Sequence, residues 1–405
     1  MSILSNRINN LAESATIKMA KLGRELAAQG VDVISLSLGE TDFFTPDFVK
    51  DAAKKAIDEN YSYYTPVAGY PELRKAIAAK LKRENKIDYN FDQIVVSTGA
   101  KQSLANAILV LVNPGEEVII PTPYWVSYSE LVKLAEGESV FINATIDTDF
   151  KITPEQLEAA ITPKTKLFMF SSPNNPTGTV YTREELAALV KVFEKYPQIH
   201  IISDEIYEHI NFIGEHTSIA EFDSVKDRVI IINGLSKAYA MTGWRLGFSA
   251  SNKTIADAID KLQSQVTSGT CSITQKAGTA AYTGSLDSVK EMQKVFLKRR
   301  DLVYGLLKEI PGLKVNLPAG AFYFFPEVSS FFGKSFEGEV IKNADDLSLY
   351  LLHKGHVATV SGDSFGDPNS IRLSYAAAED KLIEAMKRIK SALAQIKDEK
   401  AVPAV

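Results

Sequence analysis

Seven short runs of apolar residues follow one another through the middle of the chain, and most gaps between them carry a helical periodicity. The runs cover residues 94–97, 118–121, 140–143, 166–171, 199–203, 229–233 and 246–250. Runs of this length that are rich in β-branched residues are typical of buried strands. In one gap, Leu104, Ile108 and Leu111 share a helical face. Strands that alternate with helices predict an α/β fold with a mostly parallel, doubly wound sheet, in which ligands bind at the carboxyl ends of the strands.

Polar residues mark the starts of several predicted helices. Thr153 and Thr182 are each followed three residues later by a glutamine or a glutamate, which is the pattern of a capping box. Thr45 precedes a proline and an acidic residue, so we expect it to cap a helix that runs to about residue 60.

The last third of the chain has a different pattern, with long helical stretches and only short strand-like segments. The predicted elements are helices over 286–309, 344–354 and 382–396 and strands over 313–317, 321–325 and 371–374. Near the start of the chain, a helix over 11–30 and a strand over 33–38 are expected to pack with this part. We therefore predict a large domain over residues 46–290 and a smaller α+β domain made of residues 1–45 together with 291–405.

Composition narrows the class of protein. The 405 residues are 45% hydrophobic and 23% charged, and their net charge of −5 comes without a basic stripe, which argues against a nucleic-acid partner. No apolar run has the length of a membrane span or of a signal-peptide core. The single cysteine, Cys271, excludes an internal disulfide and is interpreted as structural. We therefore expect a soluble, cytoplasmic protein. We expect no metal site, because His353 and His356 have no cysteine or carboxylate cluster near them in the sequence.

Lys237 is a candidate for covalent chemistry. It stands just after the apolar run 229–233, and Arg245 follows eight positions later. A lysine beyond a buried strand can lose solvation, which lowers its pKa and makes its amine nucleophilic. A nearby arginine suits a phosphate group. The pair would fit a phosphate-bearing cofactor that forms a Schiff base, and the alternative is a solvated loop lysine.

Other strand ends carry polar residues as well. The segment 99–101 leads into a helix whose first N–H groups favour an anion, although small residues there also serve packing. Asn175 lies in a loop fixed by two prolines and a glycine, either as an available donor or as part of a tight turn. Asp204 would be costly to bury without a partner, such as a protonated ring nitrogen, and Tyr207 offers a further donor nearby.

Four motifs in this order give the chain a family resemblance. They are Ser-Pro-Asn-Asn-Pro-Thr-Gly at 172–178, Ser-Asp-Glu-Ile-Tyr at 203–207, Ser-Lys-Ala-Tyr-Ala-Met-Thr-Gly-Trp-Arg at 236–245 and Ile-Arg-Leu-Ser-Tyr-Ala at 371–376. Over nearly its whole length the chain resembles the class I/II aminotransferases that depend on pyridoxal phosphate and have fold type I. Within that family it is most similar to bacterial aspartate aminotransferases.

The resemblance implies pyridoxal 5'-phosphate as the cofactor and gives each matching residue a role. Lys237 would form the Schiff base and move a proton as base and acid. Asp204 would keep the ring nitrogen protonated, while Asn175 and Tyr207 would bond to the phenolic oxygen. Trp125 would stack on the ring, with a core or surface tryptophan as the alternative.

The resemblance also implies a phosphate site and a substrate site. The phosphate would be held by Gly99, Ala100, Lys101, Ser236 and Arg245. Arg372 would bind the substrate α-carboxylate, and Gly39 would approach it through its backbone, with Trp125 and Asn175 beside it. The family builds its site across a homodimer, in which Tyr64 would reach the partner's phosphate.

The substrate follows less directly from the motifs. In the enteric and animal branch of the family, a partner arginine binds the second carboxylate of the substrate, but segment 264–277, which aligns there, contains no arginine. Lys101 could replace it, serve only the phosphate, or be solvated. The resemblance implies ping-pong transfer of an amino group between L-aspartate and 2-oxoglutarate. The alternatives are transamination of aromatic amino acids, prephenate or alanine, a β-lyase, and a non-catalytic regulator that binds the cofactor.

Overall fold

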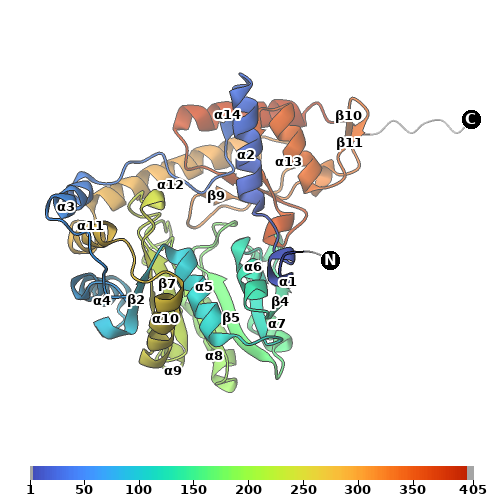
Figure 1. The fold of residues 1–405 in the computed structure, drawn as a ribbon. Coiled ribbons are helices and arrows are strands. Elements are labelled where there is room, and N and C mark those ends of the chain that lie inside the picture. Colours follow the sequence, from blue (N-terminus) through green and yellow to red (C-terminus); the bar gives the residue numbers. More distant parts are fainter. Residues whose placement is uncertain (1–2, 399–405) are drawn as a thin grey trace, which may run out of the picture.

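The computed structural model describes residues 3–398, and a seven-stranded sheet forms its centre (Figure 1). The strand order is β2-β8-β7-β6-β5-β3-β4. The strands are β2 (Ile94–Ser97), β3 (Glu117–Thr122), β4 (Glu138–Asn143), β5 (Thr165–Ser171), β6 (His200–Asp204), β7 (Val229–Gly234) and β8 (Gly247–Ala250). Each of the seven predicted runs forms one of these strands, which confirms the prediction of a central sheet.

The sheet is parallel except at one strand. Strands β3 to β7 pair in parallel, whereas β8 pairs antiparallel with both β2 and β7. The link from β7 to β8 holds only a short 3-10 turn, Thr242–Trp244, and no helix that could carry the chain back across the sheet. A connection without a crossover returns the chain antiparallel to the strand that it leaves. The prediction of a mostly parallel sheet is confirmed.

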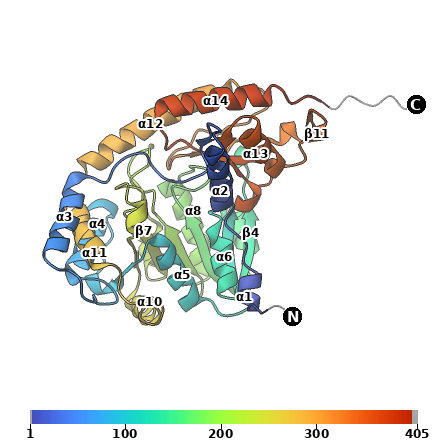
Figure 2. The same ribbon diagram turned by 45° about the horizontal axis from the view of Figure 1, so that its top comes forward.

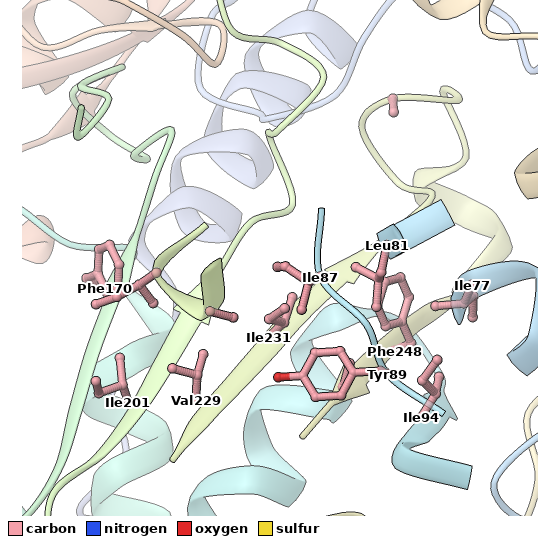
Figure 3. Packing of buried hydrophobic residues seen from close by; sticks show 14 of the residues in the cluster. Ile77, Leu81, Ile87, Tyr89, Ile94, Phe170, Ile201, Val229, Ile231 and Phe248 are labelled. Atoms are coloured by element: carbon pink, nitrogen blue, oxygen red, sulfur yellow. The ribbon is translucent and has the colours of Figure 1, made fainter. Parts of the chain in front are cut away.

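Each face of this sheet has its own apolar core, because successive strand residues point to opposite faces. Ile201 and Ile231 face one core, and Ile202 and Ile232 face the other. The first core is covered by α3 (Asp47–Asp58), α4 (Pro71–Asn85), α7 (Pro154–Ala160), α8 (Arg183–Lys195), α9 (Asp223–Lys226) and α11 (Ser272–Thr283). The second is covered by α5 (Ala100–Leu111), α6 (Ser127–Leu134) and α10 (Lys253–Val266). Figure 3 shows the first core, where side chains of α4 meet those of the sheet.

The predicted helix starts can be compared with the structure. Thr153 and Thr182 each accept a hydrogen bond from the backbone N–H three residues later at 3.3 Å, which confirms both capping boxes. The prediction for Thr45 is wrong. Helix α3 begins at Asp47, and the Thr45 hydroxyl instead donates to the carbonyl oxygen of Ala240 at 2.9 Å, which ties this segment to the β7–β8 link.

A second group of elements lies above the sheet and comes from both ends of the chain (Figures 1 and 2). Its helices are α2 (Ala15–Ala28), α12 (Asp287–Lys308), α13 (Ala344–His353) and α14 (Glu379–Leu393). Its strands are β1 (Ile34–Ser35), β9 (Tyr323–Phe324), β10 (Ser335–Phe336), β11 (Glu339–Val340), β12 (Val357–Ala358), β13 (Val360–Ser361) and β14 (Ile371–Ser374). Strand β1 pairs with β12, so the N-terminal segment joins the C-terminal part as expected. The short α1 (Asn6–Asn9) lies beside α6 instead.

One expectation for the second group of elements, the strand at 313–317, is wrong, whereas the domain limits and the interpretation of the cysteine remain open. Residues 313–317 form no strand, because Lys314 and Asn316 turn to Asp147 and Asp149 and only a single bridge to Glu327 remains. The domain limits at 45/46 and 290/291 stay a prediction. Helix α12 runs through the second limit without a break. Cys271 is exposed, and its interpretation as a structural residue stays a prediction. Within residues 3–398, no helix has the length and apolar character needed to cross a membrane.

Candidate active site

A cavity of about 240 Å³ opens where the carboxyl ends of the strands face the second group of elements. It is lined by eleven of the thirteen residues predicted from the sequence, namely Gly39, Ala100, Lys101, Trp125, Asn175, Asp204, Tyr207, Ser236, Lys237, Arg245 and Arg372. Gly99 and Tyr64 do not line it. Gly99 adjoins Arg245, where a β-carbon would strike the guanidinium, and Tyr64 is 97% exposed in the loop before α4.

Lys237 occupies the link between β7 and β8. Its Nζ atom donates to the carbonyl oxygen of Gly39 at 2.6 Å. Burial, together with the nearby positive charges of Arg372 and Arg245, lowers the pKa of Lys237 to about 8, against the attraction of Glu40 and Asp204. A substantial fraction of the amine is therefore unprotonated at mildly alkaline pH, which is the form that attacks a carbonyl.

Asp204 ends strand β6 and is buried. Its carboxylate accepts hydrogen bonds from the hydroxyl of Tyr128 at 2.8 Å and from the backbone N–H of Ile206 at 3.3 Å. Burial raises the pKa of Asp204 to about 6, although both hydrogen bonds favour the charged form. A protonated nitrogen placed against this carboxylate would be strongly attracted in such a dry environment.

Tyr128 was missed by the sequence reading. It follows Trp125 by one helical turn, and the two rings meet edge to face at 5.7 Å between centroids. Residues three apart at the start of a helix lie on the same side, so the position after a cavity-lining tryptophan could have pointed to it. Nothing in the sequence alone, however, connects Tyr128 with Asp204.

Tyr207 and Asn175 meet other polar groups inside the cavity. The Tyr207 hydroxyl shares a hydrogen bond of 2.7 Å with the hydroxyl of Tyr323 on β9. Asn175 uses its side-chain oxygen to accept from Nη1 of Arg372 at 2.9 Å. The amide NH2 of Asn175 therefore remains the donor side of this residue toward the cavity.

Arg372 is a buried cation that has no carboxylate partner among residues 3–398. It is 1% exposed, lies between the rings of Tyr323 and Phe365 at 4.6 and 4.8 Å, and donates from Nη2 to the carbonyl oxygen of Ser37 at 2.5 Å. Burial lowers the pKa of this guanidinium, because the charged form loses its hydration inside the protein. A carboxylate ligand would offset that cost through a charge-assisted pair.

The end of the cavity at the start of α5 is also positive. Arg245 donates to the carbonyl oxygen of Thr242 at 2.9 Å, and Lys101 lies 4.8 Å from the ring centre of Trp125. Burial and the charge of Arg245 both lower the pKa of Lys101. In the described part of the chain neither side chain forms an ion pair, so this end suits a phosphate or a second carboxylate.

Further lining residues come from parts of the chain that the sequence reading assigned to packing. Ser14, Thr16 and Ile17 reach the cavity from the start of α2, and the buried Thr16 hydroxyl has no hydrogen-bond partner. Tyr323 reaches it from β9. The apolar pattern of these segments predicts their elements but cannot tell which end of an element faces a cavity.

The donor set fits pyridoxal phosphate. A nucleophilic lysine lies between an acidic group, Asp204, and a positive end formed by Arg245 and Lys101. Among the described residues, no carboxylate pairs with that positive end. This arrangement matches a ligand with a basic ring nitrogen, a reactive carbonyl and a phosphate dianion.

Comparison with known proteins gives an independent result. Residues 31–389 match the family model described as "Aminotransferase class I and II". The aspartate/prephenate aminotransferase of Cereibacter sphaeroides is 47% identical over 394 residues, which cover 96% of this chain and 98% of the relative.

Solved structures agree with the sequence comparison. The aspartate aminotransferase of Rhizobium meliloti superposes with a TM-score of 0.95 at 41% identity and covers 98% of this chain and 100% of that one. The aspartate aminotransferase of Thermus thermophilus, determined with maleate, gives a TM-score of 0.90 at 37% identity over 97% of this chain and 100% of that one.

Proposed function

The chain belongs to the class I and II aminotransferase family, and on that premise we propose that it transfers an amino group between L-aspartate and 2-oxoglutarate with bound pyridoxal phosphate. One observation carries the proposal. Lys237 shares a single cavity with three cations, Lys101, Arg245 and Arg372, none of which has a carboxylate partner among the described residues. One phosphate and two substrate carboxylates would match these three charges.

The cofactor, when bound, supplies an aldehyde that links to amines and an electron-accepting ring. Lys237 would hold it covalently, and Asp204 would hold the proton on its ring nitrogen. The hydroxyl of Tyr207 and the amide of Asn175 would bond to its phenolic oxygen. Ser236, Arg245 and the start of α5 with Gly99 and Ala100 would bind its phosphate.

Lys237 would also move protons during the reaction. Its lowered pKa lets it accept the proton from the substrate α-carbon and return it to another atom of the same site. The second group of elements forms one wall of the cavity through Tyr323 and Arg372 and would keep water away from that proton.

Arg372 would bind the α-carboxylate of the substrate, with the Gly39 backbone and Trp125 beside it, and Lys101 would bind the second carboxylate. Two comparisons support a dicarboxylate. The relatives at 46 and 47% identity are named for aspartate and prephenate, and the Thermus structure contains maleate. Prephenate is also a dicarboxylic acid with an oxo group, so it is our second candidate substrate.

We further propose a cytoplasmic homodimer in which Tyr64 reaches the partner's phosphate. Tyr63, Tyr64 and Phe44 are 84, 97 and 88% exposed, and burying such large side chains would favour association. The large-domain limits at residues 46–290 belong to this proposal, since closure of the remaining residues over the substrate would follow the same division.

The test is the visible absorbance of the purified protein with pyridoxal phosphate, before and after L-aspartate is added without an acceptor. We expect the absorbance of the lysine-bound cofactor to be lost and one equivalent of oxaloacetate to appear per site. If aspartate leaves the cofactor absorbance unchanged, but it is lost with tyrosine, with alanine or with the amino acid formed from prephenate, the substrate changes and the family chemistry stays. A protein that bleaches and releases ammonia would indicate a β-lyase, and one that binds the cofactor but reacts with no amino acid would indicate a regulator.

A further inference from the structure

A buried group of charged side chains adjoins Asp204 without lining the cavity. Its first member is Glu205, the next residue along the chain, whose side chain is fully buried. Oε1 of Glu205 accepts hydrogen bonds from the hydroxyls of Ser203 at 2.9 Å and Ser218 at 2.5 Å. Its other oxygen, Oε2, lies 3.2 Å from Nε2 of His216. Glu205 thus accepts two hydroxyl hydrogen bonds and lies within ion-pair distance of one imidazole.

The second carboxylate of the group, Glu208, has partners of its own. Lys80 of α4, which is 1% exposed, forms an ion pair with Glu208. The amides of Asn85 and Asn233 donate to the same carboxylate at 2.7 and 2.8 Å. The charge of Lys80 is therefore directed to Glu208 and, at 3.8 Å, to Glu84. His216 is left as the one basic side chain within 4.0 Å of Glu205 in residues 3–398.

His216 lies in a mostly negative environment. The charged and titratable groups around it are Glu205, Glu208 and His209 of its own segment, Lys80 and Glu84 of α4, and Tyr89 beyond α4, with Glu215 and Lys86 paired at the surface. Burial on its own lowers the pKa of His216, but Glu205 and then Glu208 outweigh burial and raise it above the usual value. The imidazole, whose side chain is 7% exposed, therefore favours its protonated form more than a free imidazole does.

We propose that His216 is a positioning residue for the carboxylate that binds the cofactor. As an imidazolium it pairs with Glu205 and offsets the negative charge that Glu205 places beside Asp204. Asp204 can then stay ionised and hold the proton on the ring nitrogen of the cofactor. This inference rests on the proposed function.

The physical reason is the repulsion between two adjacent buried carboxylates. After burial, Glu205 is the group that raises the pKa of Asp204. Charges interact strongly in an interior of low effective dielectric, and an opposite charge in contact with one carboxylate cancels most of its field at the other. Without a proton on His216, the repulsion between Glu205 and Asp204 would stand uncompensated.

Three variants separate this role from packing. His216→Gln leaves Glu205 buried without a cation. Glu205→Gln combined with His216→Gln removes both charges and keeps similar volumes. His200→Gln is the matched control. His200 begins β6, the strand that ends at Asp204, and its partly buried imidazole has no carboxylate partner among residues 3–398.

The measurement is the dissociation constant of pyridoxal phosphate from each protein, prepared free of cofactor, at about pH 6.5 and about pH 8.5. If the substitution raises the pKa of Asp204 by about one unit from about 6, less of Asp204 is ionised at the lower pH, and we expect His216→Gln to bind about threefold more weakly than wild type there. At the higher pH Asp204 is ionised in both proteins, so the two affinities converge. The double variant and His200→Gln stay within about 1.5-fold of wild type at both pH values.

Several results would overturn the proposal. They are a His216→Gln affinity that matches wild type at both pH values, a loss that does not depend on pH, and a double variant as weak as the single one. If His216→Gln does not fold, the double variant and the 15N signals of the wild-type imidazole show whether His216 is the charged partner of Glu205. Nitrogen shifts of a neutral His216 ring near pH 7 in the cofactor-free protein would overturn the pairing. Because that experiment needs no cofactor, it separates this proposal from failure of the wild-type protein to bind pyridoxal phosphate.

Discussion

Tyr128 donates its phenolic hydrogen to Asp204, with 2.8 Å between Oη and Oδ2, and both side chains are buried. The other hydrogen bond to this carboxylate, from the backbone of Ile206, is longer at 3.3 Å. Tyr128 is thus the main group that favours the charged form of Asp204 against a burial that raises its pKa to about 6. A hydroxyl on α6 thereby acts on a carboxylate at the end of β6.

We predict that Tyr128→Phe weakens the binding of pyridoxal phosphate and lowers kcat/KM by about 10- to 100-fold. Loss of a hydrogen bond to a buried charged group costs roughly 1.5–3 kcal/mol, and here it makes Asp204 harder to ionise. Titration calorimetry with the cofactor and steady-state kinetics would measure the two effects. Tyr124→Phe is the control, because that hydroxyl lies in the same segment but bonds to Ser129 at 3.2 Å. Equal losses in both variants would show that Tyr128 acts through packing alone.

Gly99 offers a test of the phosphate site that does not touch its charges. Its φ is +84°, and a β-carbon there would strike the guanidinium of Arg245. Gly115 has a similar φ of +77° but open space around it. Gly99 combines this φ with a ψ of 159°, a backbone region that is essentially restricted to glycine, so alanine there costs roughly 1–3 kcal/mol of stability. Alanine at Gly115 costs roughly 1–2 kcal/mol because of its positive φ. Since Arg245 is the end of a flexible side chain, it can move away at little cost to folding.

We therefore expect Gly99→Ala and Gly115→Ala both to lower the free energy of unfolding of the cofactor-free protein, Gly99→Ala by at least as much as Gly115→Ala. Only Gly99→Ala should also weaken cofactor binding, by roughly 10-fold or more, because the loss of one charge-assisted contact to phosphate costs about 1.5–3 kcal/mol. Urea titrations and a binding isotherm would give the two quantities. Unchanged affinity in Gly99→Ala would place the phosphate away from Arg245.

The sheet could be predicted from the sequence because each strand is a short, β-branched apolar run, as in 229–233 and 199–203. The direction of β8 could not be predicted. An apolar run does not show whether its strand pairs parallel or antiparallel, and the antiparallel pairing of β8 depends on the link that contains Lys237. The strand expected at 313–317 fails for a related reason. Its alternation is real, but Lys314 and Asn316 find partners in a loop before α7 rather than in a neighbouring strand.

The candidate site was predictable where polar residues follow strands directly, as with Asp204 and Lys237. Tyr128 and Thr16 were missed because they come from helix starts, and Tyr323 because it comes from a short strand far along the chain. Their place in the cavity depends on how elements pack, which local periodicity does not encode. The roles of Lys101 and Tyr64 stay predictions, and Lys101 can be tested within one chain.

Lys101→Gln distinguishes two roles for this cation. If Lys101 binds the second carboxylate of the substrate, kcat/KM for aspartate should fall about 10- to 100-fold, with little change for alanine, which lacks that carboxylate. If Lys101 serves only the phosphate, cofactor affinity should fall and the two amino acids should lose activity equally. Kinetics with both donors at saturating cofactor, together with the cofactor dissociation constant, would decide. A variant that keeps wild-type values throughout would leave Lys101 as a lysine that only packs over Trp125.

Lys237 should make the stability of the cofactor-free protein depend on alkaline pH. Its pKa in the folded protein is lowered to about 8 from the ordinary lysine value of 10.5. Below about pH 8 the folded state must bury a charged amine, whereas above about pH 10.5 the amine is neutral in both states. Between these values the unfolded chain binds more protons than the folded one, so the contribution of Lys237 to stability rises with pH.

Lys237→Met removes this buried charge. We expect the variant to be more stable than wild type by up to ~3 kcal/mol near pH 7, and by less where water in the cavity screens the amine. The difference should shrink as the pH rises through about 8 and approach zero near about 10.5, because the wild-type amine loses its proton. Urea unfolding of both cofactor-free proteins at a series of pH values would measure it, with Lys261→Met on the exposed face of α10 as the control. A difference between wild type and Lys237→Met that stays constant with pH would mean that the amine is solvated, and the nucleophile proposed here would lose the desolvation on which its reactivity depends.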